Sequence, residues 1–189
     1  DHAGGNERLK AATGCEIVGP AEVRRIAPLD REVSDGDEVR VGATRLQVWD
    51  SGGHTLGHVV YVDANGGQAF VGDTLFAMGC GRLFEGTAEQ MWASLSRLAA
   101  LPPDTVVWCA HEYTAANARF ALSVDDAPQT RARAEAVFAA RERGEATVPT
   151  TIGAEVATNP FLRAPVLRPD LAPAEAFAAI RAAKDGFKG

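Results

Sequence analysis

The middle of the chain follows the hydrophobic pattern of strands and then of a helix, and this order limits the folds open to it. β-Rich runs at residues 58–62 and 68–71 flank an Asn-Gly pair, which supplies the positive φ angles of a tight hairpin turn. Thr87 and Gln90 then form a capping-box pattern that predicts the start of a helix, and residues 87–101 place apolar side chains at helical spacing. A continuous apolar run at 106–110 predicts a buried strand. Strand, helix and strand in this order predict an α/β fold built in layers.

The two ends of the chain carry different patterns. Short β-rich runs at 38–41 and 44–49 extend the strand-rich part, while residues 145–159 have the proline and threonine content of a connection. Helices are predicted after His111 at residues 115–122, 129–143 and 173–184. The sequence therefore predicts an α/β portion followed by a mostly helical portion.

Charge and cysteine content exclude several functions. The chain has 25 acidic and 19 basic residues, a net charge of -6, and no basic run that would follow a phosphate backbone, so nucleic acid is not an expected partner. No stretch approaches the roughly 20 apolar residues of a transmembrane helix, so a membrane is not expected either. The cysteines are scattered, at Cys15, Cys80 and Cys109. This spacing favours a reducing compartment, and we expect the cytoplasm.

Every histidine of the chain stands in a position suited to metal binding. There are four histidines, each beside glycines or at a predicted strand end: His2, His54, His58 and His111. Asp73 also ends a predicted strand, and Asp1 precedes the first histidine. Any one of these side chains alone is more often a solvated or packed group than a ligand. Together they are the imidazoles and carboxylates that a first-row metal ion prefers, fixed in direction by a sheet edge.

Seven segments, spread in order over nearly the whole chain, carry a resemblance to a known family. They are DHAGGN from Asp1, GHTLGH from Gly53, GDTLF from Gly72, GCGRLFEGT from Gly79, HEYT from His111, NPFLR from Asn159 and RAAKD from Arg181. The first, second, third and fifth resemble the metallo-β-lactamase superfamily. With the others, the chain is similar to the glyoxalase II (hydroxyacylglutathione hydrolase) family within it.

The resemblance implies a metallo-β-lactamase-like αββα sandwich with a C-terminal mostly helical domain. Residues 1–111 would form the metal-binding domain and residues 112–189 the helical substrate-binding domain. The family carries a Thr-His-x-His segment immediately before its Asp-His pair, whereas this sequence starts at the pair. We therefore expect an N-terminally truncated chain whose sandwich lacks its first strands.

The resemblance also implies a site for two divalent metal ions. Asp1, His2 and His111 would hold one ion, His54 would help to hold the other, and Asp73 would bridge both. His58 would be a supporting residue near the site. Zinc is the expected metal, with iron and manganese as alternatives, because His and Asp ligands suit all three.

The activity implied is hydrolysis of the thioester S-D-lactoylglutathione to D-lactate and glutathione, a step in methylglyoxal detoxification. A hydroxide bridging the two ions, next to the catalytic Asp73, would be the nucleophile. The partner expected is this small-molecule acylglutathione, bound by a monomeric enzyme.

Substrate contacts are predicted from cations and aromatic side chains. Arg181 and Lys184 are three residues apart on the predicted last helix, so they share a face and form either a clamp for a carboxylate or a solvated basic helix end. The resemblance favours the clamp and adds Arg82 and Tyr113 as contacts. Some members have tyrosine where this chain has Phe84, whose ring can only pack against the substrate.

Two alternatives remain at the level of sequence. One is a glutathione persulfide dioxygenase or another hydrolase of the superfamily, which shares much of the metal motif. The other is a non-catalytic fragment that binds a metal or glutathione without turnover.

Overall fold

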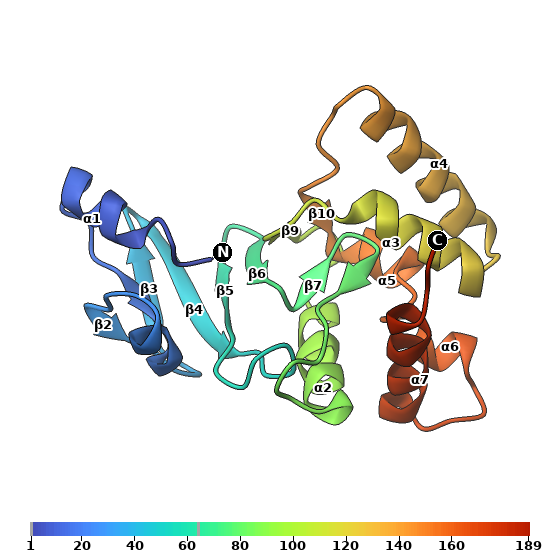
Figure 1. Cartoon of the computed structure of the whole chain (residues 1–189), viewed down its shortest axis with the longest axis horizontal. Coiled ribbons are helices and arrows are strands. Elements are labelled where there is room, and N and C mark those ends of the chain that lie inside the picture. Colours follow the sequence, from blue (N-terminus) through green and yellow to red (C-terminus); the bar gives the residue numbers. More distant parts are fainter. Residues whose placement is uncertain (1, 64) are drawn as a thin grey trace.

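The computed structural model describes residues 2–63 and 65–189, and its centre is a six-stranded sheet within those residues. The strand order is β10-β9-β6-β5-β4-β3. The strands are β3 (Glu38–Val41), β4 (Thr44–Asp50), β5 (Val59–Asp63), β6 (Gln68–Gly72), β9 (Val106–Cys109) and β10 (Thr150–Thr151). Helices of the C-terminal part gather at one end of the molecule, and the N-terminal elements lie at the other (Figure 1).

The sheet has the predicted hairpin and the predicted strand–helix–strand order. Strands β3 to β6 pair antiparallel in sequence order, and β6 then pairs parallel with β9. Helix α2 (Ala88–Ala99) connects these two parallel strands. Thr87 accepts a hydrogen bond from the backbone N–H of Gln90, whose side chain accepts one from the N–H of Thr87, so the predicted capping box is confirmed.

One apolar core joins the sheet to the helices. Met91, Leu95 and Leu98 of α2 are buried in one cluster with apolar side chains of strands β5, β6 and β9. The same cluster includes Phe161 and Phe177 from the C-terminal part. The two parts of the chain therefore share a core, and burial of this apolar surface stabilises their contact.

The C-terminal part is mostly helical, as predicted. Its helices are α3 (Thr114–Val124), α4 (Pro128–Glu142), α5 (Ile152–Thr158), α6 (Ala164–Leu167) and α7 (Pro173–Asp185). The expectation of a plain connection over 145–159 is wrong, because this segment contains β10 and α5. The hydroxyl of Thr151 accepts from the N–H of Ala154 and caps α5. Threonines are common both in loops and at helix caps, so the composition of this segment did not reveal the helix.

The N-terminal 32 residues contain short elements that the hydrophobic pattern did not reveal. They are α1 (Asn6–Thr13), β1 (Val18–Gly19), the 3-10 helix η1 (Ala21–Arg25) and β2 (Arg31–Glu32). Helix α1 buries none of its residues, so it leaves no apolar stripe in the sequence. Between β6 and α2, strands β7 (Leu75–Phe76) and β8 (Gly79–Cys80) pair antiparallel as a separate two-stranded hairpin.

Strand β9 differs from the buried strand that its apolar sequence predicts. Val107 is fully buried, but the Trp108 side chain is 41% exposed on the other face of the sheet, where it stacks on Phe70 at 6.5 Å between ring centroids.

Across the described residues, no helix is both long and apolar enough to cross a membrane.

Candidate metal centre

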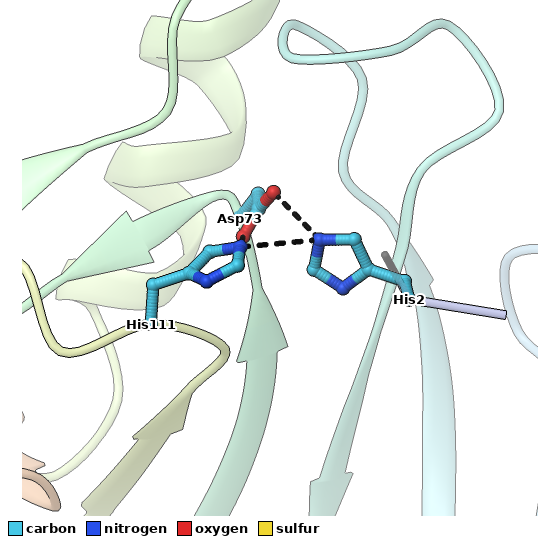
Figure 2. A group of neighbouring side chains, drawn as sticks. All are labelled: His2, Asp73 and His111. Carbon is cyan, nitrogen blue, oxygen red and sulfur yellow. Dashed lines mark hydrogen bonds and ion pairs between the residues drawn. The ribbon is translucent and has the colours of Figure 1, made fainter. Parts of the chain in front are cut away.

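Three histidine side chains converge on the carboxylate of Asp73, and Figure 2 shows two of them, His2 and His111. Oδ2 of Asp73 lies 3.0 Å from Nε2 of His2 and 3.2 Å from Nε2 of His54, and Oδ1 lies 3.4 Å from Nε2 of His111. Nε2 of His2 is also 3.3 Å from Nε2 of His111. The predicted residues His2, His54, Asp73 and His111 are therefore brought together. Asp1 lies outside the described residues.

Strand direction explains why these residues meet. Asp73 follows β6 and His111 follows β9, and the carboxyl ends of two parallel neighbours lie at one edge of a sheet. Strand β4 runs in the same direction as β6 because each is antiparallel to β5, so the loop after β4 reaches the same edge and delivers His54. His2 reaches the edge from the segment before α1.

The arrangement fits a divalent metal ion. Asp73 is only 6% exposed, and its Oδ1 has no hydrogen-bond donor among the described residues, which is costly for a buried carboxylate. One ligand atom from each of His2, Asp73 and His111 lies within 4.8 Å of the others. A cation among them would satisfy the carboxylate and use the imidazole lone pairs, and this set of nitrogen and oxygen donors suits first-row metals.

His54 is oriented by a backbone group. Its Nδ1 lies 2.9 Å from the carbonyl oxygen of Arg82, which can only accept, so Nδ1 carries the proton and donates it. Nε2 then presents its lone pair towards Asp73. Metal-binding histidines commonly have such a partner on the second ring nitrogen, since it fixes both the tautomer and the direction of the ring.

His58 contacts the backbone of Asp73 and not its carboxylate, and its ring lies 6.3 Å from that of His54. Burial, with a further contribution from His54, lowers the pKa of His58 to about 4, so its imidazole is neutral at physiological pH. Nε2 of His58 accepts a hydrogen bond from the backbone N–H of Asp73 at 3.2 Å, which leaves Nδ1–H to donate to Oγ1 of Thr74, also at 3.2 Å. His58 thus holds the backbone from which the Asp73 carboxylate projects.

Two glycines let the chain pass close to the site. Gly72 has a φ of 51°, and a Cβ there would lie 2.7 Å from Nε2 of His58. A Cβ at Gly81 would lie 2.1 Å from the backbone oxygen of Asp73 and 3.0 Å from Nδ1 of His54. The loop after β8 can therefore approach both Asp73 and His54 only if it has glycine at this position.

The predicted aromatic contacts flank the histidines. The ring of Tyr113 stacks on His111, with 4.7 Å between centroids and 15° between planes. The ring of Phe84 lies 4.8 Å from that of His54. Phe84 and Tyr113 are 66% and 50% exposed, so each presents an apolar surface next to a candidate ligand.

The predicted cations gather between the loop after β8 and helix α7. Arg181 is 5% exposed and donates to the carbonyl of Cys80 at 3.2 Å and to Asp185 at 2.8 Å, so it is not part of a solvated helix end. Lys184 donates to the carbonyl of Ala116 at 3.1 Å. Arg82 is exposed.

The environment of Lys184 is strongly cationic. Burial lowers its pKa below the usual value, and the charges of Arg181, Arg119 and Arg82 lower it further. A lysine whose charged form is disfavoured by neighbouring cations is suited to an anionic ligand, which would offset their repulsion. Arg119 of α3 was not predicted, because no sequence motif links it to α7.

Two glutamates near His54 were also missed. Glu22 accepts from Thr55 and Gly57, and Glu85 accepts from the N–H of Leu56. Both line a cavity of about 640 Å³ together with His2, His54 and Asp73. Glu22 is 33 residues from the loop that it contacts, so no local pattern could have revealed it.

Comparison with known proteins agrees with the geometry. The model of the metallo-beta-lactamase superfamily matches residues 1–111, and that of the hydroxyacylglutathione hydrolase C-terminus matches residues 112–187. A hydroxyacylglutathione hydrolase of Maricaulis maris is 55% identical over 99% of this chain. The chain belongs to the hydroxyacylglutathione hydrolase family.

Further members of the hydroxyacylglutathione hydrolase family are similarly close. The proteins of Erythrobacter litoralis and Methylococcus capsulatus are each 52% identical, over 99% and 100% of this chain. The chain covers 77% of the length of each of these relatives and of the Maricaulis protein.

Solved structures confirm the predicted fold. ETHE1 from Myxococcus xanthus has a TM-score of 0.66 and 28% identity, covering 96% of this chain and 64% of its own. TTHA1623, crystallised in a di-iron-bound form, has a TM-score of 0.57 and 27% identity, covering 86% of this chain and 72% of its own. The chain has the metallo-β-lactamase fold with the helical C-terminal domain of hydroxyacylglutathione hydrolases. The superfamily implies divalent metal ions, and His2, Asp73 and His111 form a site that can hold one.

Proposed function

We propose that this chain hydrolyses S-D-lactoylglutathione to D-lactate and glutathione, using divalent metal ions at the Asp73 site, in the detoxification of methylglyoxal. The convergence of His2, His54 and His111 on a buried carboxylate is the observation that carries this proposal. It occurs in a chain whose C-terminal residues 112–187 match the hydroxyacylglutathione hydrolase C-terminus. The same match favours the thioesterase over the persulfide dioxygenase and over a fragment without turnover.

The residues present can be assigned to two ions. Asp1, His2 and His111 would hold one ion, His54 would contribute to the other, and Asp73 would bridge them. Zinc is the metal we propose, and iron or manganese would suit the same donors. When bound, such ions lower the pKa of water towards about 7 and polarise a carbonyl oxygen, so hydrolysis needs no serine or cysteine nucleophile.

Groups of the protein orient the candidate metal ligands and would orient the substrate. His58 holds the backbone of Asp73, and the carbonyl of Arg82 holds the ring of His54. The exposed rings of Phe84 and Tyr113 would pack against the acylglutathione on either side of the histidines. Residues 1–111 would thus hold the metals.

Residues 112–189 would bind the substrate together with the loop that carries Arg82. The cations Arg82, Arg181 and Lys184 would bind the carboxylates of the glutathione moiety, because charge-assisted bonds to carboxylates are strong. We further propose a monomeric, cytoplasmic enzyme, in keeping with the free cysteines of the described residues.

Metal-dependent thioester cleavage tests the proposed function. We expect the chain loaded with zinc, iron or manganese to hydrolyse S-D-lactoylglutathione, to lose this activity in a chelator and to regain it when the metal is restored. Loss of thioester absorbance measures the rate, and elemental analysis gives the metal content. A metal-loaded chain that leaves the thioester intact but consumes oxygen with glutathione persulfide would contradict the proposal.

Replacing Lys184 tests the cationic subsite. Nζ of Lys184 lies 5.3 Å from the centre of the Phe120 ring, so the apolar side chain of Lys184→Met can occupy the same place while the charge is lost. We therefore expect KM for the acylglutathione to rise about 10-fold with kcat within about 2-fold. Steady-state kinetics measure both constants. Lys188→Met, beyond the end of α7, is the control and should leave KM unchanged. A fall in kcat of Lys184→Met as large as the expected rise in KM would contradict a role limited to binding.

A further inference from the structure

The loop that carries His54 lacks regular secondary structure and is rich in glycine. It connects β4 to β5 and contains Gly52, Gly53 and Gly57, and Gly53 has a φ of 138°. Such a segment loses much conformational entropy when it is ordered. A metal ligand, in contrast, must be held within about 0.5 Å of its working position. Other parts of the protein must therefore fix this loop.

One side of the loop is fixed by residues 84–86. The carbonyl of His54 accepts from the N–H groups of Phe84 and Glu85 at 3.1 and 3.3 Å, and the carbonyl of Gly53 accepts from the N–H of Gly86 at 3.2 Å. The carboxylate of Glu85 accepts from the N–H of Leu56 at 2.9 Å. These bonds hold the loop up to Leu56, and the N–H of Ser51 holds its far end by donating to the carbonyl of His58 at 2.8 Å.

The other side is held by one carboxylate from the N-terminal segment. Glu22 lies in η1, and its Oε1 accepts from the hydroxyl of Thr55 at 2.8 Å while its Oε2 accepts from the N–H of Gly57 at 3.0 Å. The approach is close, because a Cβ at Gly57 would lie 2.7 Å from Oε2. Both oxygens of a single carboxylate are thus used on donors that stand on either side of Leu56.

No ion pair accounts for this carboxylate. Among the described residues, Glu22 forms no ion pair with a lysine, arginine or histidine, so its acceptor capacity is directed at the loop. A charged acceptor forms stronger hydrogen bonds than a neutral one, and the side chain is only partly exposed, so water competes less. Its contacts lie one and three residues from His54.

We propose that Glu22 is a positioning residue for His54. It fixes the backbone on the C-terminal side of the histidine so that Nδ1 reaches the carbonyl of Arg82 and Nε2 faces Asp73. The inference rests on the proposed metal site, and it assigns to the segment after α1 a part in building that site. Glu22 would act through His54, and we assign it neither as a metal ligand nor as a substrate contact.

The first test reads the His54 ring without metal. In ¹⁵N NMR spectra of the metal-free chain at pH 8, we expect the His54 imidazole of the unsubstituted protein to be the Nδ1–H tautomer. Glu22→Ala should shift it towards an average of both tautomers. Glu22→Gln should keep His54 in the Nδ1–H tautomer, because a carboxamide can accept from the N–H of Gly57 and donate to the Thr55 hydroxyl. Glu32→Gln, at an exposed ion pair with Arg24, is the matched control and should change nothing.

The second test measures metal affinity by titration with cobalt. We expect Glu22→Ala to weaken binding about 10- to 100-fold, as loss of a group that orients a ligand does, with Glu22→Gln within about 3-fold of the unsubstituted chain. Thr55→Val removes only one of the two donors to Glu22, and it replaces Glu22→Ala as the test variant if Glu22→Ala does not fold. We expect Thr55→Val to weaken cobalt binding a few-fold.

The outcomes separate this inference from the proposed function. An unchanged His54 tautomer in Glu22→Ala, or in Thr55→Val if only that variant folds, would overturn the inference. So would cobalt affinity within 2-fold of the unsubstituted chain in the same variant. If the unsubstituted chain bound no metal while Glu22→Ala still altered the His54 tautomer, the proposed function would fail and the positioning of His54 by Glu22 would stand.

Discussion

Asp73→Ala is expected to reduce hydrolysis of S-D-lactoylglutathione by at least about 1000-fold and to lower the metal content of the protein. The carboxylate is the group that the imidazoles of His2, His54 and His111 share, at 3.0 to 3.4 Å. Without it those nitrogens lose their common anionic neighbour, and any ion between them loses a ligand. Loss of the electrostatic stabilisation that a metal provides is worth several kcal/mol in the transition state.

The comparison needs variants that separate charge from packing. Asp73→Asn keeps the shape of the side chain and removes the negative charge, so we expect it to be nearly as inactive as Asp73→Ala. Asp104→Ala changes an exposed aspartate in the turn before β9 and should keep the full rate. The rates are measured at saturating metal, with metal content determined for each variant. More than about a tenth of the activity in Asp73→Ala would contradict the assigned role.

Glu155→Ala is expected to lower the free energy of unfolding by about 3–5 kcal/mol. Glu155 is fully buried, and its Oε1 accepts from Arg133 and from the hydroxyl of Thr150. Its Oε2 accepts from the N–H of Met78 and from Nδ2 of Asn159, both at 2.9 Å. Removal of the carboxylate leaves the largely buried guanidinium of Arg133 without its counter-charge, and it leaves the N–H of Met78 and the hydroxyl of Thr150 without this acceptor.

Urea denaturation followed by circular dichroism measures this loss. The double substitution Arg133→Met with Glu155→Leu removes both charges, so it should be less destabilising than Glu155→Ala alone. The exposed pair of Arg143 and Glu145 is the surface counterpart, and Glu145→Ala should leave the free energy of unfolding almost unchanged. A loss of under about 1 kcal/mol in Glu155→Ala would show that the pair is not needed.

Elements with local signals were predicted from the sequence. The hairpin of β5 and β6 follows from an Asn-Gly pair, and α2 follows from the capping residues Thr87 and Gln90. Helix α5 was missed because its cap, Thr151, stands in a run with the composition of a loop. Helix α1 was missed because none of its residues is buried, so its sequence has no apolar residues repeating at helical spacing.

The same division holds at the site. Asp73 and His111 follow strands with clear patterns, and the sheet places both at one edge, so their proximity could be predicted. Glu22 could not be predicted, since its partners are 33 and 35 residues away and the contact depends on how η1 packs. The burial of Arg181 depends on the carbonyl of Cys80, which is 101 residues away. Such contacts arise from tertiary packing and leave no local pattern.

The hydrogen bond from His54 to the carbonyl of Arg82 has a consequence for ligand binding. It joins a candidate metal ligand to the loop that we propose contacts glutathione, so ordering one group orders the other. Linkage makes such coupling reciprocal. Metal ions should then tighten the binding of glutathione, and glutathione should tighten the binding of metal, by the same factor. A cell rich in glutathione would in this way help the enzyme to retain its metal.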